Sequence, residues 1–332
     1  VELHPWSDMV RFTRSGGEAN AVAIRIARAA SKKNNVAICG YHGWHDWYLS
    51  SNLSNHKNLD NHLMKSTPFL GVPKSLKNSC YPFDYNDFIQ LKKLVDKKNI
   101  GIIKMEVQRN IEPKKDFLKK ARRLCNDKNI VLIFDECTSG FRQTFGGLHK
   151  LYKIEPDIAI FGKALGNGHA INAIIGKKTI MESVNSTFIS STFWTERVGP
   201  TAALATLDVM EKTKSWDIIS SIGKKIKKNW KKLAKENKID IVIQGIDAIP
   251  NFTFNYKNHM KYKTLITQEM LKNKILASDS IYCSISHSEK ILSKYFDILN
   301  EVFYKISKIE NEESSLKDYL SSKICISGIR NK

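Results

Sequence analysis

Two residues with reactive side chains follow apolar segments in the middle of the chain. Lys163 comes after the apolar run 158–161 and opens a glycine-rich turn, whereas Asp135 follows the apolar run 130–134. Both runs are typical of buried strands, and in an open α/β sheet chemistry gathers at the carboxyl ends of the strands. A lysine there can form a Schiff base, and an aspartate can pair with a pyridinium nitrogen. Together the two residues predict a site for pyridoxal 5′-phosphate (PLP).

Each of these residues also has a purely structural interpretation. The strand before Asp135 is apolar on both faces, so a carboxylate at its end needs a partner. Alternatively, Asp135 caps a helix, since Asp, Thr and Ser are all common at N-caps. Lys163 could extend its ammonium group to solvent, whereas a desolvated lysine would have a lowered pKa and could act as nucleophile and base.

Two further segments could bind a cofactor. Ser15-Gly16-Gly17 lies between a predicted strand at 9–13 and a predicted helix at 18–30, and backbone amides at a helix N-terminus bind anions. Tyr41-His42-Gly43 follows a predicted strand at 35–39, where an aromatic ring could stack on a planar cofactor. Taken singly, a Gly-Gly pair is more often only a turn, and a loop aromatic often only fills space.

The pattern of the first two thirds of the chain predicts an α/β fold. Predicted strands alternate with predicted helices, which argues for a mostly parallel sheet with helices on both faces. The stretch 44–80 shows no strong period and is expected to be a long loop, a kind of segment that is often functional. The further predicted helices lie near 86–98, 115–127 and 198–212, and the further strands near 100–105, 130–134, 157–161 and 171–176.

We expect three parts along the chain. Residues 1–213 form a large PLP-binding domain, and a basic amphipathic helix within 214–236 links it to the rest. Residues 237–332 form a small α+β domain with a tail. Its predicted elements are strands at 239–243, 251–255 and 280–284 and a helix at 289–307.

Composition narrows the function classes. The net charge of +20 is compatible with an anionic partner, but the lysine pairs are spread along the chain and form no basic stripe interleaved with aromatics, so we expect no nucleic-acid binding. The six cysteines are scattered without a C-x-x-C pair, which predicts no metal site and suits a reducing cytoplasm. No apolar run is long enough to span a membrane, and the start lacks a signal-peptide pattern.

Four segments in this order resemble a known family. They are Ser-Gly-Gly-Glu-Ala from Ser15, Tyr-His-Gly from Tyr41, Asp-Glu-Cys-Thr-Ser-Gly-Phe-Arg from Asp135, and Phe-Gly-Lys-Ala-Leu-Gly-Asn-Gly around Lys163. They look like class III aminotransferases, and most like the glutamate-1-semialdehyde aminomutase branch, which belongs to fold type I of the PLP enzymes. The resemblance runs from about residue 9 to residue 306.

The resemblance implies roles for individual residues. Lys163 would hold PLP covalently and later carry a proton, while Asp135 would keep the pyridine nitrogen protonated. The phosphate would lie on the backbone amides of the Ser15-Gly16-Gly17 turn. The other matching positions are Tyr41, which would stack on the ring, its neighbour His42, Cys137 against the opposite ring face, Glu106 on the preceding strand, and Thr192, which would reach the phosphate of a neighbouring subunit.

The chain departs from the family pattern at four places. Gly17 stands where the family usually has Thr or Ser, so a hydroxyl to the phosphate is lost. The stretch 105–108 replaces the usual Glu-Pro, and 192–197 replaces a Thr-x-x-Gly-Asn-Pro pattern. Only fourteen residues precede the Ser-Gly turn, where the family has roughly a hundred, about a small domain, so we expect the chain to lack the family's N-terminal segment.

These observations predict a cytoplasmic PLP-dependent aminotransferase that transfers an amino group between a small-molecule donor and a carbonyl acceptor. It would act as a homodimer with shared active sites, and Phe193 and Trp194, after Thr192, would suit the interface. Alternatively, these two aromatic residues belong to an ordinary core. Two other functions stay open: an intramolecular 2,1-aminomutase, and a catalytically silent protein with the fold of a PLP enzyme.

Overall fold

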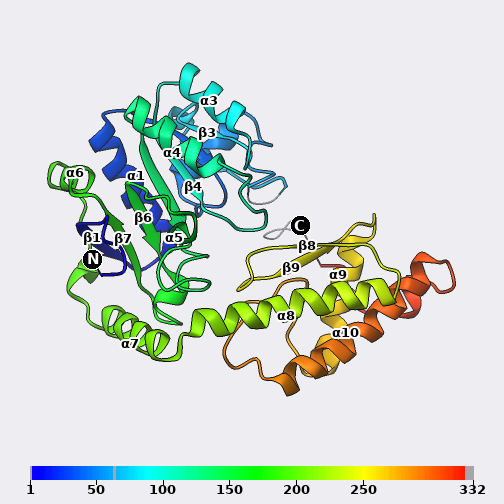
Figure 1. Cartoon of the computed structure of the whole chain (residues 1–332). Helices are drawn as coiled ribbons and strands as arrows, with labels where there is room; N and C mark the ends of the chain where they lie inside the picture. Colours follow the sequence, from blue (N-terminus) through cyan, green and yellow to red (C-terminus); the bar gives the residue numbers. More distant parts are fainter. Residues whose placement is uncertain (1, 63–64, 326–332) are drawn as a thin grey trace. The chain divides into compact units, whose positions relative to one another are not determined.

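The structure is a computed structural model that describes residues 2–62 and 65–325. The chain forms two compact units, Val1–Lys214 and Ser215–Lys332 (Figure 1). The predicted domain boundaries stay a prediction. Within the described ranges, no helix is long and apolar enough to cross a membrane. The same ranges contain no group of three or more His, Cys, Asp or Glu side chains that could hold a metal ion.

The first unit is built on a seven-stranded sheet with the order β1-β7-β6-β5-β4-β2-β3. All neighbouring pairs from β3 to β6 are parallel, and β7 is antiparallel to both β6 and β1. The sheet is therefore mostly parallel, which confirms the predicted fold class. The strands are β1 (Met9–Thr13), β2 (Asn35–Cys39), β3 (Cys80–Pro82), β4 (Ile100–Glu106), β5 (Val131–Glu136), β6 (Ile158–Phe161) and β7 (Asn172–Gly176).

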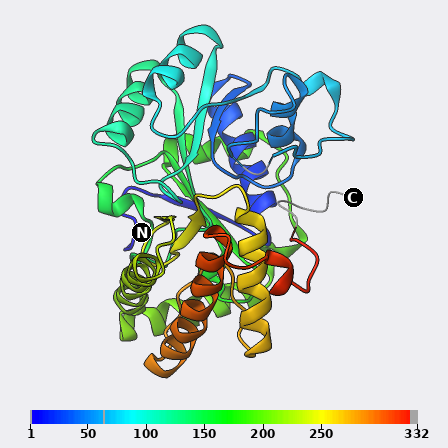
Figure 2. The same cartoon turned by 90° about the vertical axis from the view of Figure 1, so that its right-hand side faces the viewer.

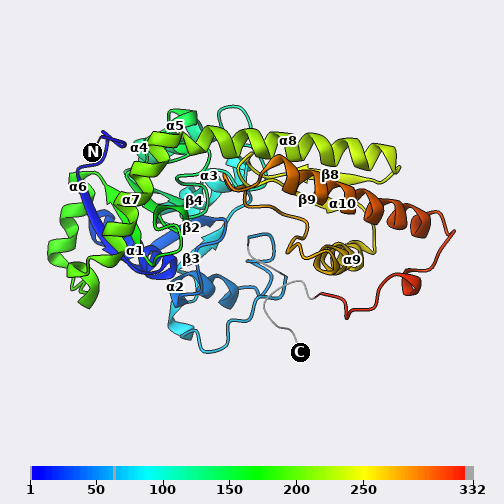
Figure 3. The same ribbon diagram turned by 90° about the horizontal axis from the view of Figure 1, so that it is seen from below.

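Helices cover both faces of this sheet. The helix α1 (Gly16–Ser31) packs on one face, where its alanines and Ile24 meet isoleucines of β4, β5 and β6. The helices α3 (Phe88–Lys97) and α4 (Phe117–Lys128) contact β2, β4 and β5, and they lie on the other side of the strands from α1 (Figures 1 and 3). Shorter helices are α2 (Asp46–Leu49), α5 (His149–Tyr152) and α6 (Lys178–Met181), and α7 (Val198–Thr213) ends the unit.

The central strands β4 and β5 are buried along their whole length. Strands covered on both faces show continuous apolar runs in place of alternation, which is why both were predictable. Their register pairs Glu106 with Asp135, so two carboxylates leave the sheet side by side. Side chains alternate along a strand, and Lys104 therefore points to the same face as Glu106.

The predicted loop at 44–80 contains more structure than expected. It holds α2, two 3-10 turns at Ser50–Leu53 and Lys74–Leu76, and the first residue of β3. Trp47 and Tyr48 anchor the segment in the core around α1. These elements are three or four residues long, too short to produce a periodic pattern in the sequence.

The second unit packs three helices with a two-stranded antiparallel sheet. The strands are β8 (Ile241–Gln244) and β9 (Asn251–Phe254). The helices are α8 (Ser215–Glu236), α9 (His259–Lys272) and α10 (Glu289–Glu310), and α10 lies between the other two (Figure 2). Trp230, Phe252 and Phe303 are fully buried at the centre of this unit.

One expectation for this unit is wrong, and one helix was missed. The segment 280–284 forms no regular strand: only Ser280 makes a β-bridge, to Asn251 of β9, and further along the amides of Ile281 and Cys283 bond carbonyls of the loop before β9. The helix α9 was not predicted. Its buried residues include Thr264 and Gln268 beside Leu265 and Ile266, so polar residues on the buried side obscure the helical pattern.

Candidate active site

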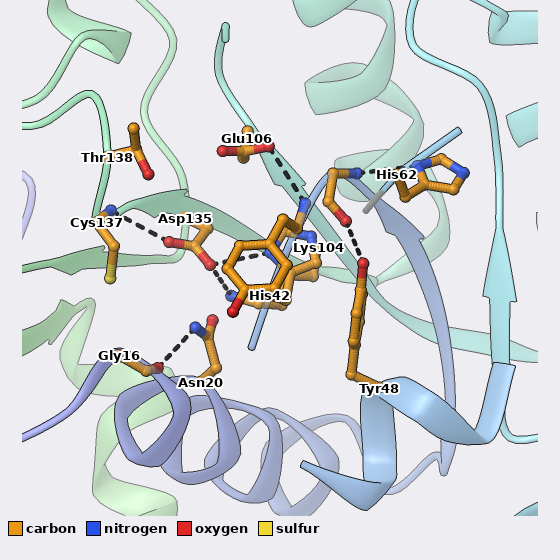
Figure 4. A network of polar contacts seen from close by, with 12 residues as sticks. Gly16, Asn20, His42, Tyr48, His62, Lys104, Glu106, Asp135, Cys137 and Thr138 are labelled. Atoms are coloured by element: carbon orange, nitrogen blue, oxygen red, sulfur yellow. Dashed lines mark hydrogen bonds and ion pairs between the residues drawn. The ribbon is translucent and has the colours of Figure 1, made fainter. Parts of the chain in front are cut away.

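The candidate site centres on Asp135, at the carboxyl end of β5 (Figure 4). Its side chain is buried and has three partners. Oδ2 accepts a hydrogen bond from Nδ1 of His42 at 2.9 Å and lies 3.5 Å from Nζ of Lys104. Oδ1 accepts a hydrogen bond from the amide of Cys137 at 3.1 Å. Asp135 is thus the acceptor of a local network, and no helix N-cap is formed by its side chain within the described residues.

The charges around Asp135 keep its carboxylate ionised. Burial alone would raise the pKa of Asp135, but the Lys104 ammonium and the bonded His42 hold it well below its usual range. Burial and the Lys104 charge lower the pKa of His42 to about 4, so this imidazole is neutral at neutral pH. A carboxylate can only accept hydrogen bonds; Nδ1 of His42 therefore carries the proton. Its buried Nε2 has no hydrogen-bond partner among the described residues.

Glu106 lies beside this network at the end of β4. Its carboxylate accepts a hydrogen bond from the amide of Tyr41 at 3.2 Å, and Arg109 lies 3.7 Å away. Burial raises the pKa of Glu106 to about 7. Gly40 permits this close approach, because it has a φ of +108° and a Cβ there would lie 2.5 Å from a Glu106 oxygen. The loop after β2 is thereby held against the end of β4.

Lys163 follows β6 and starts a 3-10 turn, Lys163–Leu165. Its side chain is exposed, and Nζ donates a hydrogen bond to Oγ1 of Thr138 at 2.7 Å. Thr138 comes three residues after Asp135, so the loops after β5 and β6 bring the amine and the carboxylate into one region. The φ of Lys163 is +45°, a left-handed conformation that costs a non-glycine residue about 1–2 kcal/mol. Such strain is typical of functional positions.

The glycine turn forms the start of α1. Gly16 and Gly17 are its first residues, and amides in the first turn of a helix have no partner within the helix. The side chain of Ser15 caps the helix by accepting from the amide of Glu18 at 3.2 Å. A Cβ on Gly17 would lie 2.5 Å from the His45 ring, and one on Gly16 would lie 3.7 Å from Sγ of Cys137. The turn is therefore next to the Asp135 network.

Tyr41 and Cys137 complete the predicted set on either side of this region. Tyr41 is half-buried and packs edge-on against Tyr48, with ring centroids 6.3 Å apart. The thiol of Cys137 is buried and lies 3.7 Å from the side-chain oxygen of Asn172 on β7. Burial raises the pKa of Cys137 well above its usual range, so its thiol is neutral.

Thr192 lies apart from these residues within the single chain. It starts the 3-10 turn Thr192–Thr195 and is exposed. Phe193 and Trp194 are 47% and 41% exposed, so the alternative that they are core residues is wrong. Arg14 lies over the Phe193 ring at 4.4 Å. The stretch is a surface of the first unit, and in the described part of the chain Thr192 has no hydrogen bond to the Asp135 network.

Comparison with known proteins identifies the family of this chain. The family profile described as aminotransferase class-III matches residues 1–274. The chain belongs to the class-III aminotransferase family. A 3-aminobutyryl-CoA aminotransferase from Cloacimonas acidaminovorans is 30% identical over 325 residues, which cover 93% of this chain and 74% of that protein. A glutamate-1-semialdehyde 2,1-aminomutase from Wigglesworthia glossinidia brevipalpis is 33% identical over 330 residues, with 90% and 74% covered.

Solved structures share the fold of this class-III aminotransferase. The FumI protein of Sphingopyxis sp. MTA144, in its PLP internal aldimine form, superposes with a TM-score of 0.82 at 18% identity and covers 96% of this chain and 75% of its own. An omega-transaminase from Sphaerobacter thermophilus superposes with a TM-score of 0.81 at 19% identity, with 92% and 76% covered. Proteins of this family use PLP, which confirms the predicted family, fold type and cofactor.

The residues of the site fit this cofactor. The helix N-terminus at Gly16 and Gly17 offers free amides to a phosphate. Asp135 offers a buried, ionised carboxylate to a pyridinium nitrogen. Lys163 offers an exposed primary amine, which bonds Thr138 on the loop that follows Asp135. The positions of these three groups are therefore compatible with PLP.

The structure adds three residues that the sequence reasoning missed. Thr138 accepts a hydrogen bond from Lys163, and Nζ of Lys104 lies 3.5 Å from Asp135. Asn20 projects from α1 toward Asp135 (Figure 4). The signal for Lys104 was present, since a lysine in an apolar strand two residues before Glu106 must face the same side. Asn20 interrupts the apolar face of a predicted helix in the same way. Thr138 carried no signal beyond its place after Asp135.

Proposed function

We propose that this protein is a PLP-dependent aminotransferase that moves an amino group from a small-molecule donor to a carbonyl acceptor. The observation that carries the proposal is an exposed lysine on the loop after β6 close to a buried, ionised aspartate at the carboxyl end of the adjacent strand β5. Lys163 bonds Thr138 at 2.7 Å, and Asp135 lies in the strand that leads directly to Thr138.

Each residue of the proposed site would have a separate role in the reaction. When bound, PLP supplies an electron sink that stabilises negative charge on the donor's carbon. Nζ of Lys163 would attach the cofactor and, once released, would carry the proton taken from that carbon. The carboxylate of Asp135 would hold the proton on the pyridine nitrogen, and the amides of Gly16 and Gly17 would bind the phosphate. Tyr41 and Cys137 would lie against the two faces of the ring.

Reduction with borohydride tests this assignment. The protein reconstituted with PLP should be labelled on Lys163 and nowhere else, which peptide mapping by mass spectrometry can establish. The matched control is Lys177→Ala, because Lys177 pairs with Asp157 and plays no part in the proposed chemistry; this variant should still be labelled. A label on another lysine, or none, would refute the proposal.

A second candidate function is an intramolecular 2,1-aminomutase, which the similarity to the Wigglesworthia glossinidia enzyme supports. An aminotransferase consumes an external donor and leaves a second product, whereas a mutase converts one compound into its isomer. Single-turnover mixing with amino donors, 3-amino thioesters among them, followed by a 2-oxo acid separates the two. Donor-dependent formation of a new amino acid from the oxo acid supports aminotransfer. Isomerisation of glutamate-1-semialdehyde without any oxo acid supports the mutase.

We infer that the active form is a homodimer with shared sites. The exposed aromatic side chains beside Thr192 support this, since aromatic residues are enriched in interface cores. Thr192 would then reach the phosphate bound by the partner subunit. The domain division into residues 1–213, 214–236 and 237–332 is part of the same proposal, with every residue of the proposed site in the large domain.

A further inference from the structure

A second lysine lies inside the candidate site, in surroundings unlike those of Lys163. Lys104 is in the middle of β4, and its side chain is fully buried. Its strand neighbours in the register are Ile38 on β2 and Ile133 on β5. Lysine is almost never fully buried unless it is paired. Its Nζ has no hydrogen-bond partner within the described residues, and its ion pair is with Asp135 at 3.5 Å.

Lys104 is the group that can balance the charge of Asp135 before any ligand is present. Burial lowers the pKa of Lys104, and the Asp135 carboxylate at 3.5 Å opposes this effect by favouring the charged ammonium. His42 bonds the same oxygen, but burial lowers its pKa to about 4 and leaves it neutral at neutral pH. The other ionisable groups that act on Lys104 are Cys137 and Glu106, whose pKa values are raised by burial. The helix α1, which covers this face, has no charged residue among its buried side chains.

We propose that Lys104 is a positioning residue that weakens the hold of Asp135 on the proton of the cofactor's pyridine nitrogen. This inference rests on the proposed function, in which Asp135 is the partner of that nitrogen. A carboxylate paired with an ammonium group attracts a pyridinium less strongly than a free carboxylate does. The buried ammonium also repels a second positive charge placed on the other side of Asp135. Both effects make the bound ring give up its proton at a lower pH.

The experiment follows the protonation of the ring directly. Wild-type protein and Lys104→Met are each reconstituted with PLP labelled with ¹⁵N in the ring, and the ¹⁵N chemical shift is recorded against pH. Methionine keeps the length of the side chain and removes the charge. We expect the ring of the variant to stay protonated to a pH at least about one unit higher, a tenfold change in proton affinity.

Two controls separate charge from packing. Ile102→Met changes a buried side chain on the same strand and face, and its ¹⁵N titration should match that of the wild type. Lys104→Arg keeps the charge and should also titrate near the wild type. If Lys104→Met does not fold, Lys104→Gln replaces it, with the same expected shift.

Each alternative result has a definite meaning. Titrations of Lys104→Met and the wild type that superimpose, with the cofactor bound to both, would overturn the role of Lys104 and leave the proposed function standing. Failure of every uncharged variant to bind cofactor, with Lys104→Arg intact, would also overturn it and make Lys104 a structural residue. A wild-type ring with the shift of free cofactor would overturn the proposed function and the inference together.

Discussion

Two groups of residues in the candidate site differ in how their polar atoms are satisfied. The inner group, Asp135, His42 and Lys104, is buried, and its members bond or pair with one another. The outer group consists of Lys163, the Gly16-Gly17 turn and Thr192, which are exposed or half-buried. The inner charges are balanced by the chain itself, whereas the outer groups have capacity left for a ligand or a second subunit.

This difference predicts two kinds of mutant. A change in the inner group should alter both the stability of the apo-protein and the chemistry, because a buried charge that loses its partner is costly. A change in the outer group should alter chemistry or cofactor retention and leave the apo-protein's stability close to that of the wild type, except where the new side chain would collide with a neighbour, as at Gly17. The following substitutions test that separation.

Lys163→Ala should have the largest effect on turnover. It removes the attachment point and the proton carrier together, so we expect the rate to fall by about 10⁴-fold or more. The unfolding free energy of the apo-protein, measured by urea denaturation, should barely change. Lys163→Gly is a useful comparison, because glycine adopts the positive φ of this position without strain. Its unfolding free energy should exceed that of the wild type by about 1 kcal/mol. A large loss of stability in Lys163→Ala would contradict the division into two groups.

Asp135→Asn should affect both properties. Without the carboxylate the pyridine nitrogen loses its charged partner, and the rate should fall by several powers of ten, each worth about 1.36 kcal/mol. Lys104 is left buried without its counter-charge, so the apo-protein should lose about 3 kcal/mol. The double variant with Lys104→Met should recover most of that stability and none of the rate. Near-normal turnover in Asp135→Asn would show that the carboxylate has only a structural role.

Glu106→Gln should change how stability depends on pH. The folded-state pKa of Glu106 is raised from 4.5 to about 7, so its contribution is present below pH 4.5 and is lost as the pH rises to 7. The difference in unfolding free energy, variant minus wild type, should therefore increase across this window by at most about 1.4 kcal/mol per pH unit. The pKa of His42 is lowered from 6.5 to about 4, so its contribution to the unfolding free energy rises with pH. Both proteins contain His42, and its contribution cancels in the difference. A flat difference would mean that Glu106 titrates normally.

Gly17→Ala should destabilise the apo-protein through a single contact. Its Cβ would lie 2.5 Å from the His45 ring, and overpacking of this kind costs about 1–3 kcal/mol. Gly16→Ala is the matched control, since its nearest contact would be an ordinary 3.7 Å; it should be neutral or stabilising by up to about 1 kcal/mol. Adding His45→Ala to Gly17→Ala should restore stability. Equal effects of the two glycine variants would argue against the contact with His45.

Thr192→Ala should have the smallest effect. If Thr192 contributes one hydrogen bond to the partner's phosphate, its loss should weaken PLP affinity by about tenfold, the value of a bond to a charged group. The defect should depend on protein concentration, because it acts through the dimer. Equilibrium dialysis at several concentrations, with Ser191→Ala as a neighbouring control, measures it. Sedimentation of a wild-type monomer that retains PLP equally well on dilution would refute shared sites.

Local signals in the sequence predicted six of the seven strands of the sheet, all but β3, and they led to the candidate site. The strands that carry Glu106 and Asp135 at their carboxyl ends have continuous apolar runs. The Ser15-Gly16-Gly17 turn separates a strand pattern at 9–13 from a helical pattern at 18–30. What such runs leave out is the role of a polar residue within them. Lys104 is in the middle of a run that identifies a buried strand, and only the register with Ile38 and Ile133 shows that its charge must be balanced inside the sheet.

Expectations failed where an element depends on a distant partner. The segment 280–284 has a composition suited to a strand, but its partner is mostly the loop 248–250 and not β9 itself, so Ser280 alone makes a β-bridge to the strand. Conversely, α9 forms because the second unit covers it on more than one side. Gln268, for example, accepts hydrogen bonds from the backbone of Ser321 and Ser322, which no pattern within the helix could reveal.

The edge strand β1 has a consequence for biosynthesis. Its residues Met9–Thr13 pair with Asn172–Gly176 of β7, and no other strand of the sheet neighbours β1. A ribosome must therefore extend the chain to residue 176 before β1 can enter the sheet. Until then, the turn at Ser15 is fixed only by the helix α1 that follows it, because the strand β1 that precedes it is not yet paired. The turn Ser15-Gly16-Gly17, proposed to bind the phosphate, is among the first segments to be translated. It is nevertheless among the last parts of this sheet edge to reach its final position, after the loop that carries Lys163 has been made.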